Sequence, residues 1–424
     1  MTPEFQRAQQ LRDLGRHEEA VAHLHTHLAH HPDDSMGHIE LAINRMNMEG
    51  QLANALEDAK RATGLMPGES FPLSLQSRIL SRLDREKEAL PLADSAIALD
   101  PDFAYAWCSK AIALIGLSRW KEAEESLRQA LEIDPDSETA SNLLSHALRM
   151  QNRLDESQDE SRRRLARDPE NAFSFANSGW AALQRGQVKE AEDLFKESLR
   201  LDPNMEYARE GLKQSYRARS AFFRLFLKWA FFMQRFSEGN QVFIVIGMII
   251  GFKVLRALFA SVNPILVIPL AIVYYLFIFG TWLANGLANF FLLSDANARL
   301  SLDKGEKAEG VVVGTFFIGG LLLLITGLAL TQYWISVIGG GLMIAAIPFS
   351  MVFTNPSGKG RLVFGALGSL ILILTSLMTV DVAANPAREI LDGNASALFS
   401  AIVLSAVACT WLGAVPALRK KRES

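Results

Sequence analysis

Two patterns of hydrophobic and polar positions divide the chain near residue 240. Before this point, short amphipathic helical segments are separated by prolines at a nearly constant interval. The prolines are Pro32, Pro67, Pro101, Pro135, Pro169 and Pro203, at steps of 35, 34, 34, 34 and 34 residues. Proline ends one helix and suits the turn into the next. A period of 34 residues predicts a helix-turn-helix unit repeated in a stack.

Small and large residues recur in register with these prolines. The fourth unit contains Trp107, Ala111, Leu114, Ala123, Leu127 and Ala130. The sixth unit contains Phe175, Gly179, Ala191 and Phe195. Small residues let two helices approach, and larger ones fill the gaps between units. The fifth unit departs from the pattern with Ser157, Ser161 and Arg164.

The period, the prolines and the small positions together resemble the tetratricopeptide repeat family, from about Thr2 to Met205. We therefore predict an all-α fold in which residues 1–215 form a solenoid of six repeats with a polar capping helix. The resemblance implies a concave groove that takes extended or helical peptides. Its groove positions correspond here to Asn44, Asn47, Arg78, Tyr105, Asn142, His146, Arg149, Phe173 and Trp180.

These groove residues have two interpretations. Arg and Asn can hold a peptide backbone or a carboxylate, and aromatic side chains can anchor a ligand. Alternatively, they are ordinary solvated side chains. The set does not match the carboxylate-clamp pattern of the family, so the sequence leaves the ligand unspecified.

Residues 216–237 are predicted to form a basic and aromatic amphipathic helix. Its cations are spaced 7, 4 and 7 residues apart along one helical stripe, and Trp229 belongs to its aromatic face. Such a helix is typical of the membrane interface, on the side that bears anionic lipids. The predicted interface residues are Arg217, Arg224, Lys228, Trp229 and Arg235. The alternative is a helix packed under the repeats.

Residues 238–424 are predicted to form a helical transmembrane domain of about six spans, since each span needs ~20 mostly apolar residues. The expected spans are Val242–Phe259, Pro264–Leu283, Gly310–Leu330, Tyr333–Phe353, Leu362–Val380 and Leu398–Leu418. Lys253 and Arg256 weaken the first span and are expected to reach the interface at its far end. The first two segments could instead form a hairpin that does not fully cross.

Charge sets the expected orientation and excludes one class of partner. The basic tail Arg419–Arg422 and the basic loops lie on the same side under an even-span count, so both termini are expected to be cytoplasmic. We expect an integral protein of a bacterial inner membrane. From Tyr216 onward the chain has 17 Lys and Arg against 9 Asp and Glu, whereas the earlier residues have 26 against 37. An acidic repeat region argues against nucleic acid as a partner.

Other features of the sequence carry weaker signals. The glycine-rich spans suit close helix packing, including a possible homo-oligomer, or alternatively broken helices that line a site. His23, His27 and His31 are spaced for a shared helical face that could bind zinc or nickel, but a polar face of a terminal repeat is favoured. The two cysteines predict no disulfide framework. The start Met1-Thr2-Pro3-Glu4 lacks a signal-peptide pattern.

No catalytic motif is visible, and no cofactor is expected. We therefore predict a non-enzymatic scaffold, in which the membrane domain anchors the repeats and the groove recruits a protein or peptide partner. The alternative is a channel, transporter or transporter subunit regulated by the repeats. An enzyme is the least favoured hypothesis, since it needs a metal at the histidines or an undetected site.

Overall fold

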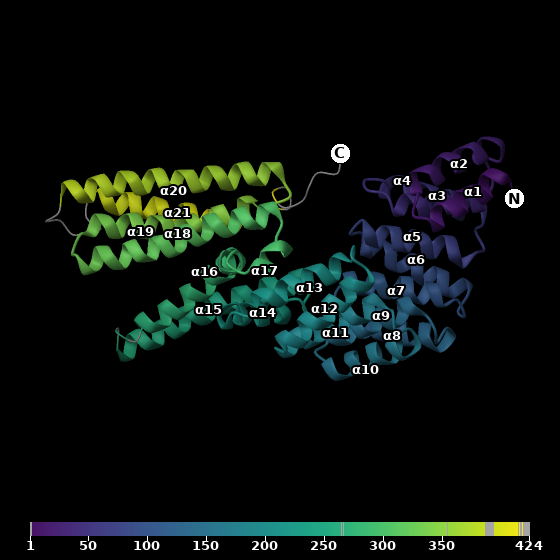
Figure 1. Ribbon diagram of the computed structural model, residues 1–424, viewed down its shortest axis with the longest axis horizontal. Helices are drawn as coiled ribbons and strands as arrows, with labels where there is room; N and C mark the ends of the chain where they lie inside the picture. Colours follow the sequence, from purple (N-terminus) through teal and green to yellow (C-terminus); the bar gives the residue numbers. More distant parts are fainter. Residues whose placement is uncertain are drawn as a thin grey trace. The chain divides into compact units, whose positions relative to one another are not determined.

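The computed structural model describes residues 2–418 apart from 264, 266, 354, 386–393, 414, 416 and 417. All the long secondary-structure elements among these residues are α-helices (Figure 1), which confirms the all-α prediction. By their contacts the helices form two compact units. The first unit extends through Ala208 and also includes Phe231–Gln241, while the second comprises Arg209–Ala230 and the chain from Val242 onward.

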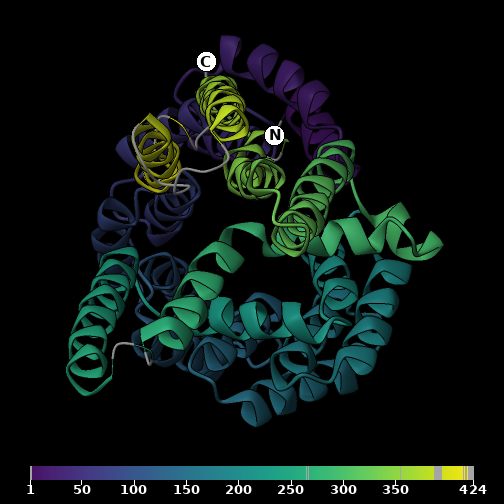
Figure 2. The same ribbon diagram turned by 90° about the vertical axis from the view of Figure 1, so that its left-hand side faces the viewer.

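The first unit contains six successive helix pairs. They are α1 (Pro3–Asp13) with α2 (His17–His30), α3 (Ser35–Met46) with α4 (Leu52–Leu65), α5 (Ser70–Arg82) with α6 (Glu86–Leu99), α7 (Ala104–Gly116) with α8 (Trp120–Ile133), α9 (Glu138–Met150) with α10 (Leu154–Arg167), and α11 (Ala172–Arg185) with α12 (Val188–Leu201). Neighbouring pairs pack against each other, and the row from purple to teal follows a curved path (Figure 2).

The turn inside each pair contains one residue with a left-handed backbone. The six residues are Gly15, Gly50, Asp84, Ser118, Asn152 and Gly186. Glycine adopts this conformation without a steric penalty, and Asp and Asn tolerate it better than most residues. Because these positions are 34 or 35 residues apart, all six repeats turn at the same place although the residue differs.

The fifth repeat replaces part of the usual apolar contact between its helices by hydrogen bonds. Ser145 on α9 lies 3.0 Å from the hydroxyl of Ser157 and 2.9 Å from that of Ser161, both on α10. All three serines are buried. Because each hydroxyl has a partner, these polar groups are buried without an unsatisfied hydrogen-bonding atom.

The remaining helices carry the apolar half of the chain. They are α13 (Glu206–Arg217), α14 (Ala221–Met233), α15 (Glu238–Val262), α16 (Val267–Leu292), α17 (Ala296–Ser301), α18 (Lys304–Ala329), α19 (Tyr333–Phe353), α20 (Gly358–Ala384) and α21 (Asn394–Leu412). Among the described residues, four stretches are long and apolar enough to cross a membrane: Gly239–Val262, Lys304–Ala329, Tyr333–Phe353 and Gly358–Ala384. They fit the expected membrane domain, and the count of six spans stays a prediction.

Glycines lie where helices of the second unit cross closely. A Cβ added at Gly320 on α18 would lie 2.6 Å from the main-chain oxygen of Gly339 on α19. A Cβ at Gly341 would similarly meet the side chain of Thr375 on α20. Both α18 and α19 continue through their glycines as unbroken helices. These glycines therefore allow close packing without interrupting the helices.

Some sequence-based expectations concern residues that lie outside the described ones. These are the basic tail Arg419–Arg422, Pro264 at the start of the second expected span, and Ala414, Pro416 and Ala417 near the end of the sixth. Lys253 and Arg256 are described, and both are exposed in the second half of α15. The expected interfacial stretch 216–237 contains the end of α13, the whole of α14 and the turn before α15.

Candidate peptide-binding surface of the repeats

The groove residues selected from the sequence all lie on the first helix of a pair or at its end. The helices are α3 (Asn44, with Asn47 just after its end), α5 (Arg78), α7 (Tyr105), α9 (Asn142, His146 and Arg149) and α11 (Phe173 and Trp180). The structure divides this set into three regions with different exposure and bonding.

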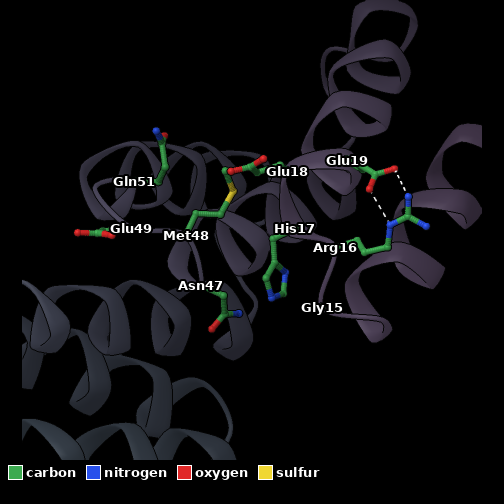
Figure 3. A pocket seen from close by; sticks show the side chains of 9 residues that line it. All are labelled: Gly15, Arg16, His17, Glu18, Glu19, Asn47, Met48, Glu49 and Gln51. Atoms are coloured by element: carbon green, nitrogen blue, oxygen red, sulfur yellow. Dashed lines mark hydrogen bonds and ion pairs between the residues drawn. The ribbon is translucent and has the colours of Figure 1, made fainter. Parts of the chain in front are cut away.

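In the first region, one asparagine is buried and the other is exposed. Asn44 is fully buried, donates from Nδ2 to the Glu40 main-chain oxygen at 2.8 Å, and lies 3.0 Å from His17 Nδ1 through Oδ1. Asn47 is exposed and, with His17 and Gln51, lines a shallow cavity of about 500 Å³ at the first two turns (Figure 3). Asn47 is therefore the one that a ligand can reach.

The middle region is an aromatic patch with a cation over it. Tyr105 lies 5.3 Å from Phe71 and 5.8 Å from Phe103 between ring centroids. The guanidinium of Arg78 lies 4.8 Å from the Tyr105 centroid, a cation–π arrangement. All four side chains are half-buried, and burial raises the pKa of Tyr105. Arg78 forms no ion pair within the described chain, so this patch keeps an uncompensated positive charge.

The third region, on α9 and α11, is largely closed. Asn142 accepts a hydrogen bond from Ser174 at 3.1 Å. The centroid of His146 lies 5.9 Å from that of Trp120, and burial followed by the nearby charge of Arg149 lowers its pKa to about 3. Arg149 is only 4% exposed and lies 5.7 Å from the Trp180 centroid. Its Nε has no hydrogen-bond partner.

Aromatic rings consolidate this closed region at the end of the array. Phe173 stacks on Tyr207 with centroids 5.2 Å apart, and the Trp180 indole donates to the Tyr207 main-chain oxygen at 3.3 Å. Tyr207 in turn donates its hydroxyl to Asn177 at 3.2 Å, and burial raises its pKa. Phe173 and Trp180 therefore hold the start of α13 against the last repeat.

Part of the stretch expected at the membrane interface lies on the repeats, in keeping with the alternative that the sequence left open for it. Residues 231–241 group with the first unit, and Arg235 contacts both Trp120 and Asn152. The spacing of Arg235 from Lys228 predicts a position at the membrane interface instead. No local pattern links residue 235 to residue 120, since the contact depends on the curvature of the whole array.

The other expected interface residues have different surroundings. Lys228 is exposed, and Arg224 is half-buried and donates to the Ala218 main-chain oxygen at 3.1 Å. Trp229 lies edge-on to Phe277, with centroids 5.2 Å apart. Arg217 is 4% exposed. Of the four cations, Lys228 is thus the most exposed.

Arg217 instead belongs to a buried charge cluster in the second unit. It donates from Nε to Asn289 Oδ1 at 2.9 Å and from Nη2 to Glu306 Oε1 at 3.0 Å. Lys213 donates to the same Glu306 oxygen at 3.1 Å. Asn289 also donates from Nδ2 to Glu309 at 3.0 Å. The cluster joins α13 to the ends of α16 and α18 through paired charges.

The histidines of the first repeat have partners in the first two repeats, since His17 contacts Asn44 and His25 contacts Arg45, both on α3. His27 is buried and lies 2.7 Å from Thr2 Oγ1 and 2.6 Å from Asp34 Oδ2. His23 contacts Glu4, and the ring of His31 lies 5.1 Å from that of His27. Among the residues that the structure describes, no group of three or more His, Cys, Asp or Glu is arranged to hold a metal ion.

Stacked helix pairs with a common turn define a helical repeat protein that also carries a set of long apolar helices. Two tetratricopeptide repeat models match residues 104–137 and 142–206. With the 34-residue period and the six pairs, these matches identify the N-terminal half as a tetratricopeptide repeat array. No curated protein matches this chain.

Solved tetratricopeptide repeat proteins are similar to the same half. TTC0263, a thermophilic repeat protein of Thermus thermophilus, is 16% identical, with a TM-score of 0.40, covering 43% of this chain and 98% of its own. YrrB, described as having an unusual peptide-binding site, is 18% identical, with a TM-score of 0.32 and coverages of 45% and 97%. PilW, a type IV pilus biogenesis factor, is 18% identical, with a TM-score of 0.42 and coverages of 49% and 96%.

Proposed function

We propose that this chain is a non-enzymatic, membrane-anchored scaffold whose repeats recruit a protein or peptide partner. The observation that carries the proposal is the middle patch, in which Arg78 lies over Tyr105 beside Phe71 and Phe103. Aromatic rings and arginine are the side chains that most often dominate binding energy at protein interfaces. Because Arg78 has no carboxylate partner in the described chain, an acidic group on a partner would complete the patch.

The apolar helices support the anchoring part of the proposal. They are long and apolar enough to cross a membrane, and the exposed Lys228 lies shortly before the first of them. We propose that the chain is integral to a bacterial inner membrane, with both termini in the cytoplasm, Lys228 at the lipid surface and glycine-rich helices available for self-association. In this arrangement the patch is held near the membrane, where it increases the local concentration of whatever it binds.

Crosslinking in intact cells, followed by membrane purification and mass spectrometry, tests the recruiting function. The full chain is compared with a variant carrying Arg78→Ala and Tyr105→Ala. The matched control is Lys110→Ala, because Lys110 also lies over an aromatic ring, that of Trp107, but is already paired with Asp94 at 2.9 Å.

We expect one protein to be captured by the wild type and by the control, and to be lost from the double variant. Equal capture by all three chains would place the recruiting surface elsewhere. An absence of any captured protein would contradict the scaffold function and leave the membrane helices as the functional part.

One observation favours a second candidate, a channel, transporter or transporter subunit regulated by the repeats. The structure extends α18 to Lys304 and so brings the buried Glu309, bonded to Asn289, into a helix long enough to span. Ionisable residues inside membrane helices often mark ion or substrate paths. Purified full chain in liposomes distinguishes the candidates, since a scaffold gives no solute or ion flux, whereas a transporter gives flux that Glu309→Gln reduces.

A further inference from the structure

Residues 231–236 of the chain lie on the last three repeats and are held by one side chain from each. Trp120 of the fourth repeat donates from Nε1 to the main-chain oxygen of Arg235 at 2.8 Å. Asn152 of the fifth repeat accepts from Nη2 of Arg235 at 2.7 Å. Trp180 of the sixth repeat meets Phe231 edge-on with ring centroids 6.2 Å apart. This set contains the same kinds of contact that hold a bound peptide.

The chemistry of the segment supports this comparison. Phe231 is 4% exposed and acts as an aromatic anchor. Phe236 and Arg235 border a cavity of about 570 Å³ that Trp120, Met150 and Gln151 also line. Because Trp120 binds a main-chain oxygen, it would hold any residue type at position 235, whereas Trp180 selects an apolar side chain.

Two arginines at the contact between residues 231–236 and the repeats, Arg149 and Arg235, lack part of their hydrogen bonding. The Nε atoms of Arg149 and Arg235 are both buried without a hydrogen-bond partner. Neither guanidinium pairs with a carboxylate within the described chain. Burial lowers the pKa of Arg235, in keeping with a cation that has lost water and gained no counter-charge. Leaving a buried donor unsatisfied weakens the closed arrangement relative to one with all partners present.

We propose that residues 231–236 are a displaceable intramolecular ligand of the fourth to sixth repeats. In the closed state Phe231 covers Trp180, on whose ring Arg149 lies. When the segment leaves, this part of the repeats becomes accessible, and with it the guanidinium of Arg149, which has no carboxylate partner in the described chain. The middle patch around Arg78 is open in both states, so the array has one permanent and one gated binding region. The release of the segment concerns contacts within the chain and does not require the proposed recruiting function, whereas the two binding regions rest on it.

Limited trypsin digestion of the full chain in detergent micelles tests the proposal. Trypsin cuts after Arg235 once this segment has left the repeats, and mass spectrometry follows the rate of that cut. Trp120→Phe keeps the ring against His146 but removes the indole donor. Asn152→Gly keeps the left-handed turn, at φ +64°, but removes the acceptor of Arg235.

Trp107→Phe is the matched control. The Trp107 indole also donates at 2.8 Å to a main-chain oxygen, that of Pro101, but within its own repeat. We expect Trp120→Phe and Asn152→Gly each to speed the cut after Arg235 by about fivefold to tenfold, the usual effect of losing one net hydrogen bond. The control should cut at the wild-type rate, and cuts inside the repeats should keep their rates in all three variants.

Three results would overturn the proposal. Equal rates in both variants and the control would show that these contacts do not hold the segment. A wild-type cut as fast as that of a free peptide of residues 229–241 would show that the segment is not bound. If the cut after Arg235 appears only together with cuts throughout the repeats, the segment is a permanent brace that leaves only on global unfolding.

Discussion

Alanine substitution at two glycines should change the stability in opposite directions, because Gly179 packs against Phe195 and Gly64 packs against nothing. A Cβ added at Gly179 would lie 2.8, 2.9 and 3.0 Å from three ring carbons of Phe195. The ring is fully buried, and Trp180 lies edge-on to it at 5.5 Å, so it has little room to move. Gly64, near the end of α4, is exposed and a Cβ there would meet nothing within 4 Å.

The two substitutions should therefore differ in sign. Overpacking costs about 1–3 kcal/mol, and exchanging Gly for Ala inside a helix gains about 1 kcal/mol. For Gly179→Ala the net result is a loss of about 1 kcal/mol. For Gly64→Ala the clash is absent, and the result is a gain of up to about 1 kcal/mol.

Amide hydrogen exchange on the full chain measures both effects in place. Since 1.4 kcal/mol corresponds to tenfold, amides of α11 and α12 should exchange about fivefold faster in Gly179→Ala. Amides of α4 should exchange up to about fivefold more slowly in Gly64→Ala. Adding Phe195→Leu to Gly179→Ala should remove part of the clash. A Gly179→Ala chain that exchanges no faster than the wild type would refute the argument that Phe195 cannot yield.

Two further predictions concern the buried polar groups of the fifth repeat. Ser145→Ala should lower the free energy of unfolding by about 1–3 kcal/mol because it removes a partner from buried hydroxyls. Changing Ser145, Ser157 and Ser161 together to Ala should lower it much less. Denaturant titration measures both values. His146 has a pKa of about 3 in the folded chain, below its unfolded value, so its contribution to stability is complete above about pH 6.5 and falls as the pH drops toward 3. Between pH 7 and 5 the free energy of unfolding of the wild type should fall by about 2 kcal/mol, a loss that His146→Phe should not show. Equal losses in both chains would contradict the assigned pKa. NMR titration of the ring measures that pKa directly.

The repeat architecture could be predicted from the sequence because its signals are local and periodic. Proline ends a helix wherever it occurs, so six prolines at one interval predict six pairs without knowledge of their packing. The turn conformation is harder to predict from the sequence, since Gly15, Gly50 and Gly186 suggest a left-handed position but Ser118 does not. The serine contacts of the fifth repeat depend on which faces of α9 and α10 meet, and residue type alone does not define that.

The exposure of the candidate groove residues could be predicted only in part, for a physical reason. Family positions select residues by their place on the first helix of each pair, and Asn47, Arg78 and Tyr105 do remain at least partly accessible. Arg149 is 4% exposed and lies on the ring of Trp180, which Tyr207 and Phe231, far along the sequence, also contact.

The start of α18 could have been predicted more closely. The apolar pattern alone puts the start of this span at Gly310, but Asp303 and Glu306 form a capping box that begins the helix at Lys304. An acidic residue three positions after an Asp is a recognisable helix start. This capping box predicts that Glu306 and Glu309 lie in the helix, whereas the contact of Glu306 with Arg217 depends on the tertiary fold.

The serial arrangement of the repeats has a mechanical consequence. Each helix pair contacts mainly its neighbours, and no central core joins all six. If the two ends of such an array are pulled apart, every repeat bears the same load, and the least cohesive one yields first. In the fifth repeat the buried residues of α10 are Ser157, Glu160 and Ser161, so this helix contributes no buried apolar side chain to resist extension. On the proposed scaffold function, a partner that pulls on the array would therefore extend it first at the fifth repeat.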